Sequence, residues 1–84
     1  MTAVIETGPG ITRTVDARGS FCPGPLMELI RAIRESQVGD VIAVLSSDKG
    51  SKMDIPKWIE KAGHKLVTLE TREGYDEIVV QKAR

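Results

Sequence analysis

Two closely spaced prolines follow the only cysteine of this chain, in Cys22-Pro23-Gly24-Pro25, and restrict the backbone more than any other stretch. A residue before proline is pushed out of the α region into the extended conformation that a helix N-cap needs. Proline is tolerated in the first helical turn, because the first four N–H groups of a helix have no partner within the helix. We therefore predict that a helix begins here, with Cys22 as its N-cap and Pro23 at its first position.

The same position favours a reactive thiol. A helix N-terminus carries partial positive charge and unpaired N–H donors, which favour a thiolate over a thiol and lower the pKa of a cysteine. Gly24 has no side chain that could crowd the sulfur, and Arg18 adds positive charge if its loop folds back toward the helix. We predict that Cys22 is an approachable nucleophile.

Length and composition indicate one ordinary globular domain spanning residues 1–84, with 40% hydrophobic and 29% charged residues. The 12 basic residues balance the 12 acidic ones, so the chain lacks the excess positive charge of proteins that bind phosphate backbones. We therefore expect no direct nucleic-acid partner.

No apolar run approaches the roughly 20 residues that span a bilayer, and the N-terminus lacks a signal-peptide pattern. We expect a cytoplasmic protein without a membrane partner. One cysteine cannot close an intramolecular disulfide, and together with His64, the only histidine, it cannot fill a structural zinc site. We expect no metal and no cofactor, so covalent chemistry at Cys22 must involve another molecule.

Hydrophobic spacing divides the rest of the chain into alternating elements. Residues 1–11 contain the breaker Gly8-Pro9-Gly10 and are expected to form a flexible arm. We predict strands at 12–16, 41–45, 65–70 and 77–81 and helices at 23–36 and about 54–62. The start of the second helix is open between a capping box of Ser51 with Asp54 and Asp54 itself as N-cap, because Pro56 should not lie deep in a helix.

The order of these elements is βαβαββ. The apolar run 41–45 shows no alternation, which is typical of an interior strand covered on both faces or nearly so. The first two strands should form a parallel unit with a right-handed crossover, and the last two an antiparallel hairpin. We predict an α/β fold in which two helices pack on a mixed four-stranded sheet.

One set of residues resembles the TusA family of sulfur-carrier proteins over about residues 12–82. The pattern is Asp16-x-Arg18-Gly19-x-x-Cys22-Pro23-x-Pro25, an amphipathic helix, and then Asp54-Ile55-Pro56 at the second helix. The resemblance implies a two-layer α/β sandwich and a sulfurtransferase that works only with partner proteins. Its cysteine would accept sulfane sulfur as a persulfide and pass it on. By position, Cys22 would be the catalytic residue, Pro23 and Pro25 the motif prolines, and Asp16, Arg18 and Gly19 the loop support.

The resemblance also implies partners. The donor would be a cysteine desulfurase or a rhodanese, and the acceptor a protein with a reactive cysteine, such as a DsrE-like protein. The sulfur would serve transfer-RNA thiolation, molybdenum cofactor supply or oxidative sulfur metabolism. We expect the carrier itself to be a monomer. One departure is Met53, which precedes Asp54-Ile55-Pro56 where many relatives have a basic residue.

Several residues have two readings. Lys52, Lys57 and Lys61 either dock a partner or form a solvated surface, and Asp16 with Arg18 either supports the cysteine loop or is simply solvated. Trp58 is expected in the core rather than as a ligand platform, and His64 at the surface rather than as a base for Cys22. Two rival functions stay open: an adaptor or regulator that never carries sulfur, and a redox sensor that forms mixed disulfides at Cys22.

Overall fold

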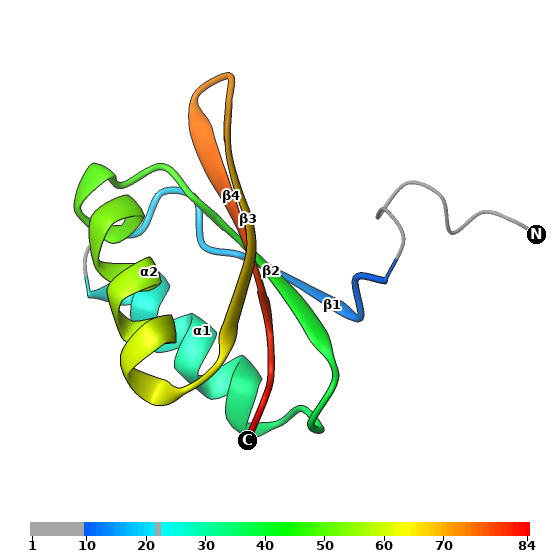
Figure 1. The fold of residues 1–84 in the computed structure, drawn as a ribbon. Coiled ribbons are helices and arrows are strands. Elements are labelled where there is room, and N and C mark those ends of the chain that lie inside the picture. Colours follow the sequence, from blue (N-terminus) through cyan, green and yellow to red (C-terminus); the bar gives the residue numbers. More distant parts are fainter. Residues whose placement is uncertain (1–9, 22) are drawn as a thin grey trace, which may run out of the picture.

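The computed structural model describes residues 10–21 and 23–84, so residues 1–9 and Cys22 lie outside the described part of the chain. The predicted arm 1–11 is therefore described only at Gly10 and Ile11. The elements are β1 (Arg13–Asp16), α1 (Gly24–Arg34), β2 (Val41–Ser46), α2 (Lys49–Ala62), β3 (Lys65–Arg72) and β4 (Tyr75–Gln81) (Figure 1). This is the predicted βαβαββ order.

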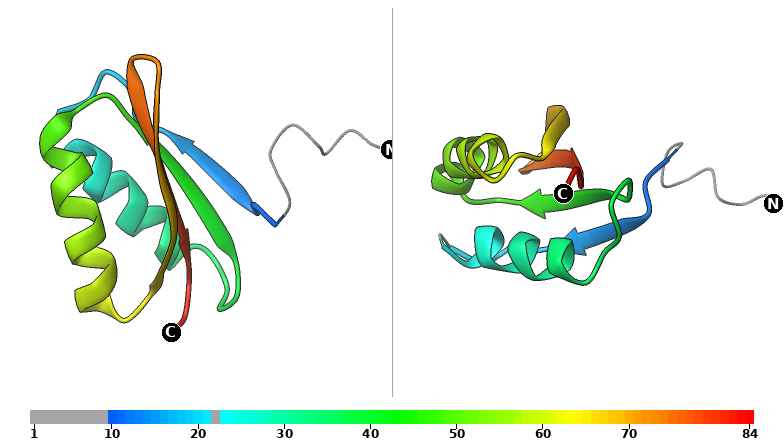
Figure 2. Two further views of the ribbon diagram at one scale, coloured as in Figure 1. Left: turned by 45° about the horizontal axis from the view of Figure 1, so that its top comes forward. Right: turned by 60° about the horizontal axis from the view of Figure 1, so that its bottom comes forward.

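The four strands form one mixed sheet with the order β1-β2-β4-β3. β1 pairs with β2 in parallel, and β4 pairs antiparallel with both β2 and β3. Both helices cover the same face of the sheet, which gives the two layers visible in Figure 2. The predicted mixed sheet, its interior strand at 41–45 and its C-terminal hairpin are confirmed.

The core lies between the sheet and the two helices. Alternate residues of β2 and β4 meet residues three or four positions apart on α1 and α2, as the periods of strand and helix require. The fully buried members are Leu29, Ile42, Val44, Ile55, Ile59, Ile78 and Val80. Trp58 packs against this cluster, as predicted.

The face of β2 that points away from the helices is also shielded. Ala43 is 0% exposed although no helix lies over it, and its cross-strand partner Val79 is 6% exposed. Longer side chains of neighbouring strands, Thr14 and Gln81 among them, line this face. This arrangement explains why residues 41–45 of β2 are all apolar although the sandwich has only two layers.

The predicted start of α1 is wrong by one residue. Pro23, not Cys22, is the N-cap residue, and Gly24 takes the first helical position. The backbone N of Met27 donates to the Pro23 carbonyl at 2.9 Å, so this carbonyl accepts the first bond of the helix. Pro25 then stands in the first turn and costs no intrahelical bond. The helix ends at Arg34, slightly before the predicted 36.

Both predicted starts of α2 are also wrong, because the helix begins at Lys49 and includes Pro56. Asp48 is the N-cap, and its Oδ2 accepts from the Ser51 backbone N at 2.9 Å and from the Ser51 Oγ at 3.0 Å. The helix continues through Pro56 because Ile55 is fully buried against the sheet. Gly63 ends α2 in the left-handed conformation, as the sequence indicates.

Candidate functional site

One end of the molecule gathers the residues that the sequence singles out. β1, β2 and β3 run in the same direction, since the last two are both antiparallel to β4. Their C-terminal ends therefore meet at one edge of the sheet, together with the start of β4 and the N-termini of α1 and α2 (Figure 1). The loop from Ala17 to Phe21 crosses this edge and leads to Cys22, which lies outside the described residues.

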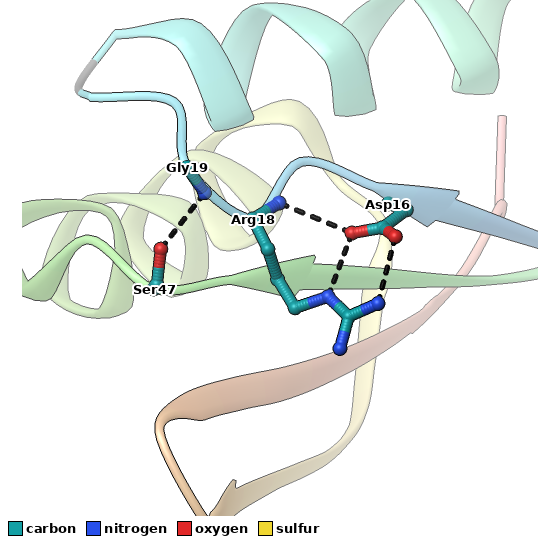
Figure 3. Close-up of polar contacts among 4 residues, drawn as sticks. All are labelled: Asp16, Arg18, Gly19 and Ser47. Carbon is teal, nitrogen blue, oxygen red and sulfur yellow. Dashed lines mark hydrogen bonds and ion pairs between the residues drawn. The ribbon is translucent and has the colours of Figure 1, made fainter.

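Asp16 and Arg18 form a forked ion pair at the start of this loop (Figure 3). Arg18 Nε donates to Asp16 Oδ1 at 2.9 Å and Nη2 donates to Oδ2 at 2.8 Å, while the Arg18 backbone N donates to Oδ1 at 3.2 Å. The hydrogen bonds from the Arg18 side chain and backbone lower the pKa of Asp16 to about 2. Both residues are exposed, but they pair with each other and order the backbone between them.

Arg18 makes a second contact, with the hairpin. Its Cζ lies over the ring of Tyr75, 4.9 Å from the ring centroid, which is the geometry of a cation–π interaction. Tyr75 is the first residue of β4 and pairs with Arg72, the last residue of β3. The guanidinium group is thus held between Asp16 of β1 and the β3–β4 turn.

Backbone bonds tie the same loop to the end of β2. The Ala17 N donates to the Leu45 carbonyl at 2.9 Å, and the Ala17 side chain is buried. The Gly19 N donates to the Ser47 Oγ at 2.9 Å (Figure 3). Gly19 has a φ of 91°, a conformation that residues with a side chain rarely adopt. These contacts order the loop that leads to Cys22, and the role of Asp16, Arg18 and Gly19 in supporting the cysteine stays a prediction.

The residues on either side of Cys22 are exposed. Phe21 is 80% exposed, and Pro23 is exposed as well. Pro25 is fully buried in the first turn of α1 and anchors the helix start. A Cβ on Gly24 would lie 3.1 Å from the Ser20 Cβ, so this glycine also lets the loop approach the helix closely. That Gly24 leaves the sulfur uncrowded stays a prediction.

The three lysines proposed for docking occupy different settings. Lys52 Nζ donates to Thr71 Oγ1 at 3.0 Å and lies 3.6 Å from Asp76 Oδ1, so it ties α2 to the hairpin. Lys57 and Lys61 are exposed. Met53 is 63% exposed and lines a shallow depression between α2 and the hairpin. A docking role for these residues stays a prediction.

His64 lies at the other end of α2 from the cysteine loop, directly after Gly63 (Figure 1). Its Nδ1 accepts a hydrogen bond from the Ala83 backbone N at 3.0 Å, and its ring centroid lies 5.6 Å from that of Trp58. Burial lowers the pKa of His64, and the nearby charges of Lys82 and Arg84 add to this effect. The residue holds the end of the chain and is half-buried rather than fully at the surface.

The contacts of Ser47 and Tyr75 with the loop could not be predicted from the sequence. Both lie far along the chain from the residues that they contact, Ser47 directly after β2 and Tyr75 at the start of β4, and neither belongs to a motif of its own. Only the parallel pairing of β1 with β2 would have indicated that the residue after β2 lies beside the loop after β1.

Within residues 10–21 and 23–84, no cluster of histidine, aspartate and glutamate side chains could hold a metal ion. Among the described helices, neither is long and apolar enough to cross a membrane.

Comparisons with known proteins agree with this geometry. A family model described as "Sulfurtransferase TusA" matches residues 13–82. A "Putative sulfur carrier protein" from Archaeoglobus fulgidus is 56% identical over 70 residues, which cover 83% of this chain and 96% of that protein. A "Sulfur carrier protein TusA" from Pseudomonas syringae pv. syringae is 38% identical over 60 residues, which cover 71% of each chain.

A solved structure gives the same result. The crystal structure of a SirA-like protein from Desulfitobacterium hafniense matches with a TM-score of 0.74 and 29% identity, covering 86% of this chain and 99% of the other. The fold and these relatives define a small sulfur carrier protein. The chain belongs to the TusA family, as its sequence pattern indicated.

Proposed function

We propose that Cys22 carries the sulfur. The supporting observation is that this member of a sulfur carrier family has one cysteine, so only one thiol can form a persulfide. The Cys22 thiolate attacks the outer sulfur of a donor persulfide, and the donor thiolate leaves as the new S–S bond forms. An acceptor thiolate then attacks the outer sulfur of the Cys22 persulfide, and the Cys22 thiolate is released. Each step exchanges one S–S bond for another, so no oxidant is consumed.

The surroundings of Cys22 favour this chemistry. The Gly24 N–H is already bonded to the Phe21 carbonyl and Pro25 has no N–H, so the positive end of the α1 dipole is what stabilises negative charge just before the helix. The carboxylate of Asp16 is neutralised by Arg18, so it does not oppose a thiolate. The exposed neighbours Phe21 and Pro23 leave room for the cysteine of another protein. No cofactor enters either step.

The donor in this proposal is a cysteine desulfurase or a rhodanese, and the acceptor is a DsrE-like protein or another protein with a reactive cysteine. The chain is then a sulfurtransferase whose rate has meaning only with a partner. The exposed Lys57 and Lys61 on α2, with Lys52 near the hairpin, offer positive charge for recognising these partners.

The test is intact-protein mass spectrometry under non-reducing conditions. The wild type and Cys22→Ser are incubated with a cysteine desulfurase plus cysteine, and separately with a rhodanese plus thiosulfate. The wild type should gain the mass of one sulfur atom and lose it on reduction. The Cys22→Ser variant should gain no sulfur from either donor. The better donor separates biosynthetic from oxidative sulfur flow.

The two rival functions predict other results. A redox sensor should gain a glutathione adduct under oxidation and no sulfur from either donor. An adaptor should keep its partner binding in Cys22→Ser. A wild-type protein that alkylates readily but gains no sulfur from either donor would contradict the proposal.

A further inference from the structure

The loop between β1 and the cysteine is held by contacts from two distant parts of the chain. Asp16 and Arg18 fix its first residues by their ion pair. Ser47, after β2, and Tyr75, at the start of β4, hold it from outside (Figure 3 for Ser47). Neither of these two residues belongs to the family pattern in the sequence.

Ser47 acts through the backbone. Its Oγ accepts from the Gly19 N at 2.9 Å and joins two connections that lie 28 positions apart. The preceding residue, Ser46, is fully buried, and its Oγ accepts from the Asp48 N at 3.1 Å. Ser47 therefore lies between two well-held residues, the buried end of β2 and the N-cap residue of α2. Its hydroxyl fixes the position of the Gly19 amide.

Tyr75 acts through Arg18. The forked pair with Asp16 fixes the plane of the guanidinium group, and the Tyr75 ring then packs against that plane at 4.9 Å from Cζ to centroid. Tyr75 is half-buried and paired in the sheet, so its ring has little freedom. The contact fixes the loop relative to the hairpin.

Among the contacts of the described residues, no other one ties the segment between Gly19 and Cys22 to the sheet. Phe21 is 80% exposed, and the Ser20 N bonds only back to the Ala17 carbonyl, at 3.2 Å. The Gly24 N, in turn, donates to the Phe21 carbonyl at 2.6 Å. Ser47 and Tyr75 therefore hold the path by which the chain enters α1, in addition to the buried Ala17, whose backbone N bonds the Leu45 carbonyl.

We propose that Ser47 and Tyr75 are positioning residues for sulfur transfer, holding the loop from Arg18 to Phe21 so that the chain enters α1 along one path. The inference rests on the proposed role of Cys22. Loosening the loop lets the thiol spend less time before the N-terminus of α1. The thiolate then loses stabilisation, and its pKa moves toward the ordinary value of about 8.5.

The test measures the alkylation rate of Cys22 as a function of pH, together with sulfur uptake from rhodanese and thiosulfate. The variants are Ser47→Ala and Tyr75→Leu, each with a conservative partner that keeps the contact: Ser47→Thr retains the hydroxyl and Tyr75→Phe retains the ring face. The matched control is Ser36→Ala. It also removes one serine hydrogen bond, from Oγ to the Ala32 carbonyl at 2.7 Å, but at the far end of α1.

At neutral pH, Ser47→Ala and Tyr75→Leu should alkylate and take up sulfur more slowly, by up to about threefold for a rise of half a pKa unit. Their alkylation rates should match the wild type at alkaline pH, where every thiol is ionised. Ser47→Thr, Tyr75→Phe and Ser36→Ala should keep the wild-type pH profile.

An unchanged profile in Ser47→Ala and Tyr75→Leu would overturn the inference, and so would an equal change in Ser36→Ala. The alkylation assay needs no sulfur donor, so it is independent of the proposed function. If the profile shifts as expected but the wild type takes up no sulfur, positioning of the thiol stands and the sulfur-carrier role of Cys22 fails.

Discussion

At the scale of single residues, Arg18 is the most connected side chain of the described site. It pairs with Asp16, lies against Tyr75 and shares a loop with Gly19. Because the hydrogen bonds from Arg18 hold the pKa of Asp16 at about 2, below its ordinary value of 3.8, the pair persists throughout the neutral range. Its small contribution to stability is present above about pH 4 and is lost as the pH falls toward 2.

Gly19→Ala should reduce both stability and thiol reactivity. A side chain at a φ of 91° is strained by about 1–2 kcal/mol, and relief of that strain would move the amide that bonds Ser47. Urea unfolding measures the first effect and the alkylation rate at neutral pH the second.

Gly39→Ala is the matched control, because Gly39 has a φ of 99° and, like Gly19, no atom within 4 Å of an added Cβ. It should lose similar stability and keep the wild-type alkylation rate, since it lies between α1 and β2 at the other end of the sheet. Equal alkylation rates in both variants would show that Gly19 acts on stability alone.

At the scale of elements, the helix starts are set by contacts that the hydrophobic pattern does not contain. α1 begins where the Pro23 carbonyl accepts its first bond, and α2 begins where Asp48 caps Ser51. Both helices begin at the edge of the sheet where β1, β2 and β3 end. The caps therefore position the helix ends beside the loop of residues 17–21 as well as stabilising them. Lys82 does the same for the other end of α1, where its Nζ donates to the Ile33 and Ser36 carbonyls at 2.7 Å each.

Asp48→Ala should lower the free energy of unfolding by about 1 kcal/mol, the usual cost of removing an N-cap side chain. The variant leaves the Ser51 backbone N without its acceptor at the first turn of α2. Asp48→Asn keeps an acceptor oxygen and should recover most of the loss. Chemical denaturation of the three proteins compares these values, and an undiminished stability in Asp48→Ala would argue against Asp48 as the start of α2.

At the scale of the whole molecule, the two ends of the sandwich differ in the contacts that they make. The edge with the loop of residues 17–21 exposes both Arg18 and Phe21, whereas at the opposite edge His64 and Lys82 hold the chain by hydrogen bonds. The His64 Nδ1 can accept from the Ala83 N only when it is unprotonated. Burial lowers the pKa of His64 below its ordinary value of 6.5, so protonation opposes folding.

Stability should therefore fall as the pH drops below about 6.5, because the unfolded chain binds the His64 proton more tightly than the folded chain does. His64→Asn removes the titrating group and should lack this part of the pH dependence. Urea unfolding of both proteins on either side of that pH measures the difference. Parallel curves would show that His64 does not couple protonation to folding.

Much of the fold followed from the sequence, because it depends on local periodicity. The apolar stripe of α1, the unbroken run of β2 and the polar turn before β4 predicted the elements and their order. The start of α2 could not be predicted, because burial of Ile55 outweighs the local cost of Pro56.

The site divides in the same way. Asp16, Arg18 and Gly19 belong to one short motif and could be predicted as a group. Ser47 and Tyr75 could not, because they reach the loop through the pairing of β1 with β2 and of β3 with β4. A sequence read without the register of these strands contains no sign of either contact.

The most direct measurement locates the sulfur on the chain. The protein is loaded by a rhodanese from thiosulfate whose outer sulfur carries a heavy isotope, alkylated, and digested with trypsin. Cleavage after Arg18 and Arg31 releases residues 19–31, which contain Cys22. We expect the isotope on this peptide as a trapped persulfide that reductant removes. A peptide whose thiol alkylates readily but carries no labelled sulfur would contradict the assignment of sulfur transfer to Cys22.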